Sequence, residues 1–108
     1  MYEEQPERAY IDTNVLVAMV FRERKHRHKI EIIRNELKQG RYTLVISYFT
    51  LMEFLQVIRY RLTERHRPEE DPNKVCEYVE RRSRELYNKL IEQLIRISGK
   101  QFKIVPAN

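Results

Sequence analysis

"RAYIDTNVLVAMVF", residues 8–21, is an apolar segment that a single acidic residue interrupts. Apolar side chains fill positions 9–11 before Asp12 and positions 15–21 after it. A carboxylate in such surroundings costs solvation free energy unless another group pairs with it. The role of Asp12 is therefore the first question that the sequence raises.

The size and composition of the chain predict one small globular domain. Its 108 residues are too few for two domains of ordinary size, and the balance of 42% apolar and 34% charged residues indicates a small core rather than disorder. The apolar runs are too short to span a membrane and no N-terminal segment resembles a signal peptide, so we expect a soluble, cytoplasmic protein. The single cysteine, Cys76, excludes an internal disulfide and a cysteine-cluster zinc site.

The pattern of apolar residues predicts an α/β fold with a parallel sheet, because short buried strands are separated by longer helical segments. Asn14 is a favourable N-cap for the first helix, and Gly40 is a stop signal for the second. The expected strands cover residues 8–12, 42–47 and 101–106, and the expected helices run from near residue 14 to 21, over 25–39, over 48–65, and from about residue 73 to 98.

Two acids occupy positions where packing alone would favour apolar residues. Asp12 ends the first expected strand, and Glu53 lies in "FTLMEFL" (49–55), one short turn after the second. Because ligands in open α/β sheets bind outside the carboxyl ends of the strands, we expect both carboxylates to face one crevice. Two converging carboxylates need a cation, and Mg²⁺ or Mn²⁺ suits such oxygen ligands. Water held at such a site can be activated to attack a phosphodiester.

Each acid also has a purely structural interpretation. Asp12 would cap the helix that follows it, a role that Thr13 or Asn14 could share. Thr50 and Glu53 match a capping box, in which the glutamate accepts a hydrogen bond from a backbone N–H. The coincidence of both acids at one sheet edge favours the metal site over two separate capping roles.

Three segments carry a resemblance to the PIN-domain nucleases. "YIDTNVLVA" (10–18) is similar to the opening motif of that family, a hydrophobic strand that ends in Asp, followed by Thr-Asn and an apolar helix. "VISYFTLMEFL" (45–55) resembles the second motif, and "FKIVP" (102–106) resembles the third strand of many members. The resemblance implies a three-layer, PIN-like α/β fold with a short parallel sheet of about three strands flanked by helices.

The resemblance also implies an activity and partners. Many PIN domains are toxins of prokaryotic toxin–antitoxin pairs, metal-dependent endoribonucleases that a small antitoxin protein blocks. By position, Asp12 and Glu53 would be the catalytic, metal-binding carboxylates, with Mg²⁺ or Mn²⁺ as cofactor and RNA as substrate. Asn14 would orient Asp12, and Ser47 or Thr50 would hold the site or a metal-bound water.

The family pattern extends beyond what these motifs supply. PIN domains take a third Asp from a later helix and a fourth from a later strand end, and no residue after Pro106 corresponds to them. We therefore expect residues 1–108 to be a single, truncated PIN-like domain without its C-terminal strands, incomplete or inactive as the isolated chain. The first strand would then have a bare apolar edge, which predicts a homodimer or a larger assembly through that edge.

The charge balance favours an anionic partner. The net charge is +5 and the pI is about 9.5, although many basic proteins bind no nucleic acid. The tract "RERKHRHK" (22–29) supplies Arg22, Arg24, Lys25 and Arg27 as candidate contacts to RNA phosphates. A solvated surface is the competing interpretation of this tract.

Two functions therefore follow from the sequence. The first is a metal-dependent endoribonuclease of the PIN toxin type. The alternative is a non-catalytic PIN-like module that acts through protein–protein contact or RNA binding, which the missing third and fourth acids favour.

Overall fold

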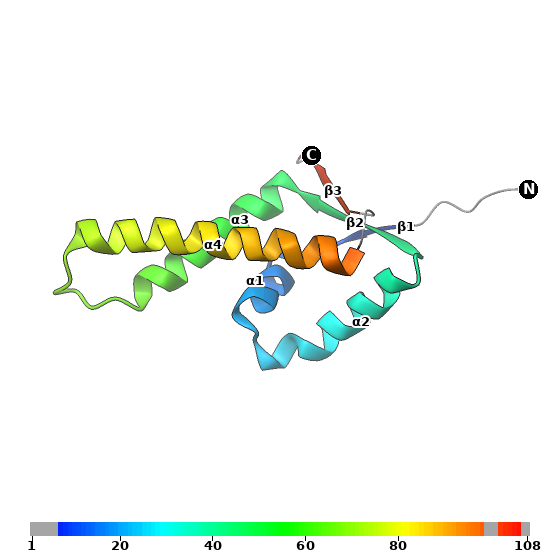
Figure 1. Cartoon of the computed structure of the whole chain (residues 1–108), viewed down its shortest axis with the longest axis horizontal. Coiled ribbons are helices and arrows are strands. Elements are labelled where there is room, and N and C mark those ends of the chain that lie inside the picture. Colours follow the sequence, from blue (N-terminus) through cyan, green and yellow to red (C-terminus); the bar gives the residue numbers. More distant parts are fainter. Residues whose placement is uncertain (1–6, 99–101, 107–108) are drawn as a thin grey trace, which may run out of the picture.

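The computed structural model describes residues 7–98 and 102–106, which form a parallel sheet and four α-helices (Figure 1). The α/β fold class and the three parallel strands predicted from the sequence are confirmed. The strands follow the order β1-β2-β3 across the sheet. Their bounds are β1 (Glu7–Tyr10), β2 (Tyr42–Ser47) and β3 (Phe102–Val105). The helices are α1 (Thr13–Phe21), α2 (Arg27–Lys38), α3 (Tyr48–Glu64) and α4 (Pro72–Ser98), and a short 3-10 helix, η1 (Arg24–His26), precedes α2.

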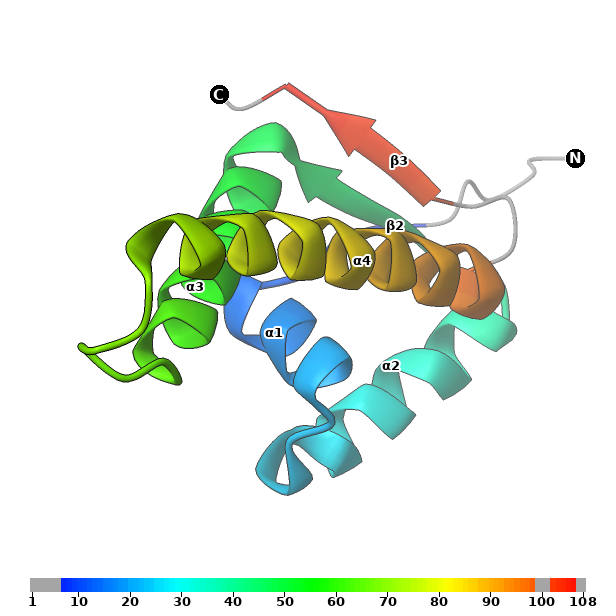
Figure 2. The same cartoon turned by 60° about the vertical axis from the view of Figure 1, so that its left-hand side comes forward.

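The central strand β2 joins the two halves of the sheet and is buried on both faces. Leu44, Val45 and Ile46 are each at most 1% exposed. Leu44 and Ile46 share one core cluster with side chains from all four α-helices. The helices therefore pack on the face of the sheet that carries Leu44 and Ile46, as Figure 2 shows. This follows from the strand order, because right-handed crossovers between successive neighbours place their helices on the same face.

The opposite face of the sheet carries side chains that remain in contact with solvent. Tyr10 and Lys103 lie opposite Val45 in the register, and both are exposed. A further helical layer over this face, as the predicted three-layer arrangement would require, is not formed by residues 7–98 and 102–106.

The helix α1 lies at the centre of the helical layer. Leu16, Val17 and Ala18 are at most 2% exposed, and α1 contacts α2, α3 and α4. A helix that is apolar on nearly all sides is stable only in such a buried position. It ends at Phe21, and the capping residue Arg22 adopts a left-handed conformation with φ of 54°, while the Glu23 N–H donates a hydrogen bond to the carbonyl of Ala18.

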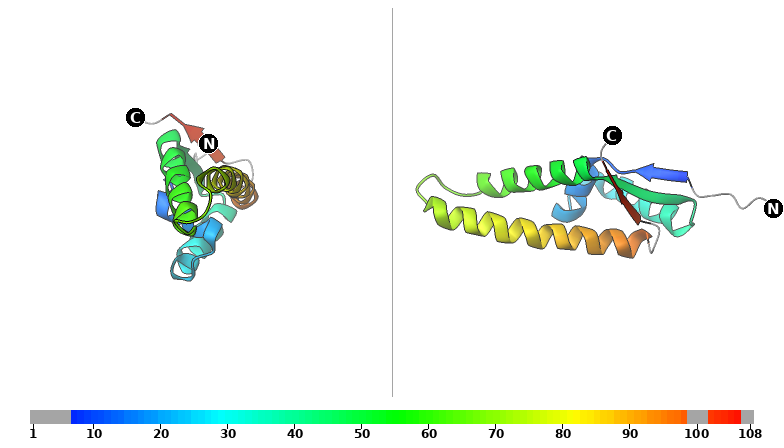
Figure 3. Two further views of the ribbon diagram at one scale, coloured as in Figure 1. Left: turned by 90° about the vertical axis from the view of Figure 1, so that its left-hand side faces the viewer. Right: turned by 90° about the horizontal axis from the view of Figure 1, so that it is seen from above.

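The helices α3 and α4 form a long antiparallel pair that extends beyond the sheet (Figure 3). Both present an apolar stripe at helical spacing to each other and to the core. Pro72 begins α4 at a position that needs no N–H donor, and Asp71 Oδ1 accepts a hydrogen bond from the Asn73 N–H at 3.0 Å. The buried residues of the two stripes are Leu51, Phe54, Ile58 and Leu62 on α3 and Val79, Leu86, Leu90 and Leu94 on α4.

Two predicted boundaries were wrong, each for a local reason. The first strand ends at Tyr10 rather than at residue 12, because the Asp12 carbonyl is already used by the first turn of α1. The helix expected over 25–39 is divided at His26, whose backbone (φ −107°, ψ 1°) departs from α-helical geometry. Part of the predicted last strand, residue 101, lies outside the described residues. No helix among the described residues is long and apolar enough to cross a membrane.

The packing of α3 against α4 and the sheet predicts a sharp difference between two isoleucines. Ile58 on α3 is fully buried, whereas Ile95 on α4 is 51% exposed. Ile58→Ala leaves a cavity and should lower the free energy of unfolding by about 2–5 kcal/mol. The matched control Ile95→Ala should change it by less than about 0.5 kcal/mol. Urea denaturation followed by circular dichroism measures both, and equal effects would contradict this core.

Candidate functional site

Asp12 occupies the N-cap position of α1, two residues after β1 ends. Its backbone is extended (φ −72°, ψ 148°), and its carbonyl accepts hydrogen bonds from the N–H groups of Val15 and Leu16 at 3.1 and 3.3 Å. The side chain forms no capping hydrogen bond within the described residues, and it is exposed. The capping interpretation of the Asp12 side chain was therefore wrong. Its carboxylate stays available at the positive end of the helix dipole, which favours an anion there.

Glu53 lies on α3 and faces the same segment of chain. Its Oε2 accepts a hydrogen bond of 3.3 Å from the Thr13 hydroxyl. Thr13 is 7% exposed and directly follows Asp12, so this bond brings the start of α1 and the first turns of α3 together. In the sequence analysis, Thr13 was assigned only a helix-capping role. Its position next to Asp12 was the sequence feature that could have indicated its contact with Glu53.

The capping box assigned to Thr50 and Glu53 was also wrong. The helix α3 begins three residues earlier than that motif requires, and Ser47 is its N-cap. The Ser47 hydroxyl accepts a hydrogen bond from the Thr50 N–H at 3.1 Å and lies 2.9 Å from the Thr50 hydroxyl. Glu53 is therefore inside the helix, where its carboxylate is not needed for capping.

Asn14 lies exposed in the first turn of α1. No hydrogen bond between Asn14 and the Asp12 carboxylate is formed within the described part of the chain. The orienting role of Asn14 therefore stays a prediction, as do the supporting roles of Ser47 and Thr50 toward a metal.

The candidate site has the donor chemistry that a hard cation requires. Asp12 and Glu53 supply carboxylate oxygens, and neither takes part in the three ion pairs formed among the described residues. The described residues contain no cluster of three or more Asp, Glu, His or Cys side chains suited to a metal. Two carboxylates with the remaining positions left to water match the ligation that Mg²⁺ commonly takes in proteins.

Large apolar side chains are exposed around the start of α3. Tyr48, Phe49 and Met52 are 55–61% exposed, close in sequence to Glu53. Phe49 is one of these exposed side chains and is not part of the core. Its position in the first turn of α3 points it away from the stripe formed by Leu51 and Phe54.

The structure divides the basic tract into two pairs. Arg22 and Arg27 line a hollow between α1, α2 and α4, whereas Arg24 and Lys25 do not line it. All four side chains are exposed, and α1 separates this hollow from Asp12 at the other end of the helix. The predicted RNA contacts are thus not part of the carboxylate site.

A comparison with known protein families agrees with the two motifs and the sheet described above. The family model of the PIN domain matches residues 9–104. The chain belongs to the PIN domain family. PIN domains form a nuclease superfamily whose members generally use divalent metal ions. No curated protein and no solved structure matches this PIN domain significantly.

The capping role of Ser47 predicts the effect of its removal. Ser47→Ala deprives the Thr50 N–H of its acceptor and should lower the free energy of unfolding by about 1 kcal/mol. Ser47→Asn, which keeps an acceptor at the N-cap, should restore most of that loss. Thermal or urea denaturation compares the three proteins, and an unchanged stability in Ser47→Ala would contradict the cap.

Proposed function

We propose that this PIN domain is a metal-dependent endoribonuclease of the toxin class, which hydrolyses RNA phosphodiesters. The hydrogen bond between Thr13 and Glu53 carries the proposal, because it brings a second carboxylate to the segment that holds Asp12. Membership of the PIN domain family supports the reaction class. Among the described residues neither acid caps a helix or forms an ion pair, and this supports a role for both carboxylates in binding a metal ion.

In this proposal the chain's own residues hold and orient the reacting groups. Asp12 and Glu53 bind Mg²⁺ or Mn²⁺, Thr13 holds the Glu53 carboxylate, and Ser47 fixes the start of the helix on which Glu53 lies. A divalent ion held there would activate a water molecule and stabilise the charge that develops on the phosphate. Two carboxylates would leave coordination positions for water, as Mg²⁺ commonly requires.

The partners in this proposal are an RNA substrate and a cognate antitoxin protein, with a cytoplasmic setting. Both would act on the edge of the sheet where β1 and β2 end, since the two carboxylates lie there. The exposed Tyr48 and Phe49 offer rings at the same end of α3 on which RNA bases could stack.

A non-catalytic PIN module remains the second candidate. The observation that favours it is the lack, among the described residues, of a cluster of three metal-ligating side chains. Such a module would bind RNA or protein through the same surfaces without cleavage.

Substitution of the two acids separates these candidates. Asp12→Asn and Glu53→Gln should each lower cleavage of a labelled RNA in Mg²⁺ or Mn²⁺ by about two orders of magnitude or more, because each removes a charge that holds the ion. Asp71→Asn, the same change at a helix-capping acid, should leave cleavage unchanged. Calorimetric titration with Mn²⁺ should show binding to the wild type that Asp12→Asn loses.

The outcomes of this experiment are distinct. Melting temperatures close to that of the wild type would show that the substitutions act on the site rather than on the fold. Equal cleavage by Asp12→Asn and the wild type would refute the assignment. A wild-type chain that binds RNA but cleaves none with either metal would favour the non-catalytic module.

A second part of the proposal concerns assembly. Among the described residues β1 pairs only with β2, so its other edge presents unpaired backbone groups. We propose that a second copy of the chain covers this edge. Light scattering should then give a mass of at least twice 13.3 kDa.

Two proline variants of β1 test which edge is used. Successive N–H groups of a strand point to opposite edges, so Arg8→Pro and Ala9→Pro affect opposite sides of β1. One variant should lose pairing with β2 and unfold, and the other should stay folded as a monomer. Assembly that persists in a folded proline variant, or a monomeric wild type, would contradict this interface.

A further inference from the structure

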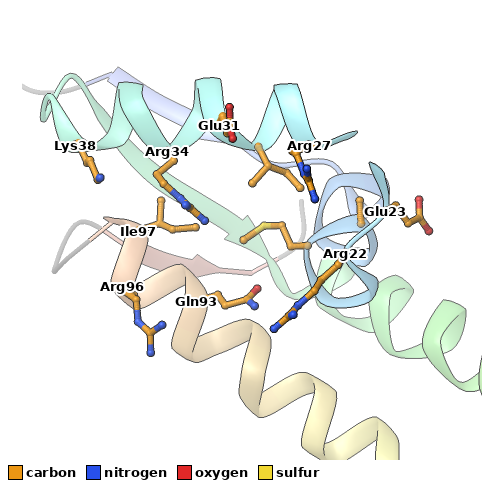
Figure 4. A pocket seen from close by; sticks show the side chains of 12 residues that line it. Arg22, Glu23, Arg27, Glu31, Arg34, Lys38, Gln93, Arg96 and Ile97 are labelled. Atoms are coloured by element: carbon orange, nitrogen blue, oxygen red, sulfur yellow. The ribbon is translucent and has the colours of Figure 1, made fainter. Parts of the chain in front are cut away.

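A hollow of about 530 Å³ lies between the second half of α1, one face of α2 and the last turns of α4. Its size is that of a site for a small organic ligand or a nucleotide. Figure 4 shows Arg22, Arg34 and Gln93 reaching into this space from three different elements. Its floor is aliphatic, and consists of Ala18, Met19, Ile30 and Ile97.

Positive charge predominates around the hollow. Five basic residues and two acidic residues line it. One of the acids, Glu23, is paired with Arg61, whose hydrogen bond lowers the pKa of the Glu23 carboxyl. None of the five basic side chains takes part in an ion pair formed among the described residues. The five are Arg22, Arg27, Arg34, Lys38 and Arg96.

The basic residues of α2 form a row along one helix face. Arg27, Arg34 and Lys38 are seven and four residues apart, which places them on the same side of the helix. The row extends over roughly 16 Å, given the rise of an α-helix. Such a linear array of cations matches the regularly spaced charges of a phosphodiester backbone.

The chemistry of the lining favours RNA over an acidic protein. Four of the five cations are arginines, whose planar guanidinium groups bind phosphates bidentately and stack on bases. Cores of protein–protein interfaces are depleted of charge and rich in aromatic side chains. The hollow has no aromatic residue among those that line it, and charged residues line it from α2, from α4 and from the segment directly after α1.

The hollow is separate from the carboxylate site. Asp12 lies at the start of α1, whereas Ala18, Met19 and Arg22 border the hollow from its second half and its end. Lys38 ends α2, just before β2 begins, so the row runs toward the amino ends of the strands. The helix α1 is about 12 Å long, a distance that a few nucleotides of single-stranded RNA can bridge.

We propose that this hollow is a second RNA-binding site, which binds the phosphodiester backbone of a single-stranded segment. This site lies at the end of α1 that is remote from Asp12 and Glu53. The choice of RNA as ligand rests on the proposed function. The second site would hold one segment of the RNA strand while the adjacent segment of the same strand lies at the carboxylate site.

Fluorescence anisotropy with a labelled single-stranded RNA of 12 nucleotides in EDTA tests this site without cleavage. Arg34→Glu should weaken binding by about tenfold or more, because it reverses a charge in the centre of the row. Arg67→Glu makes the same change at an exposed arginine outside the hollow, and should weaken binding by less than about threefold. Lys38→Glu and Lys74→Glu form a second matched pair, should Arg34→Glu unfold in thermal melting.

The results have separate meanings for the two proposals. Equal losses in a hollow variant and its control, or no RNA binding by the wild type, would overturn the second site. Binding of a labelled poly-glutamate peptide that depends on Arg34, without such dependence for RNA, would also overturn it and assign the hollow to a protein. Binding is measured in EDTA, where no divalent metal is held and no RNA is cleaved, so failure of the cleavage proposal leaves this measurement intact.

Discussion

Burial of α1 is the constraint on which the other contacts of this domain depend. Its nine residues are apolar apart from the first two, and the side chains of Leu16 and Ala18 are inaccessible to solvent. A helix of this composition gains its stability from removal of apolar area from water rather than from intrinsic propensity. The sheet and the helices α2, α3 and α4 must therefore surround it, and they share one core cluster.

This burial also fixes where the polar ends of α1 lie. Its first turn contacts α3, where the Thr13 hydroxyl donates a hydrogen bond to Glu53, and Arg22, directly after its last residue, turns the chain toward α2 in a left-handed conformation. The start of the helix lies beside the candidate carboxylates, and its end borders the basic hollow. A short rigid helix thus sets the spacing between an acidic region and a basic region on one small domain.

In the proposed function, the two regions would serve complementary parts of the reaction. Carboxylates without a basic partner favour a divalent cation, whereas unpaired arginines favour phosphates. Separation keeps the arginines from neutralising the carboxylates, since an Arg–carboxylate pair would compete with the metal for the same oxygens. In the described structure neither acid is paired with a basic side chain, which is consistent with this arrangement.

Local sequence patterns predicted the kind and order of the elements. Alternation and helical spacing are local properties, so "YTLVIS" (42–47) and the stripe from Leu51 to Leu62 indicated β2 and α3 within about a residue of their observed bounds. The sequence also singled out Asp12 and Glu53, because an acid among apolar neighbours is visible without a structure. The motifs around them pointed to the PIN domain family, which the family model confirms.

The packing of the folded chain established which roles those acids do not take and which distant residues are in contact. Whether Asp12 caps a helix depends on side-chain geometry, and whether Ser47 rather than Thr50 begins α3 depends on one turn of backbone. The contact between Thr13 and Glu53 joins residues 40 positions apart, and the hollow brings together arginines from α2, from α4 and from the end of α1. Such long-range contacts arise from the packing of α1 against its neighbours, and no local sequence pattern specifies them.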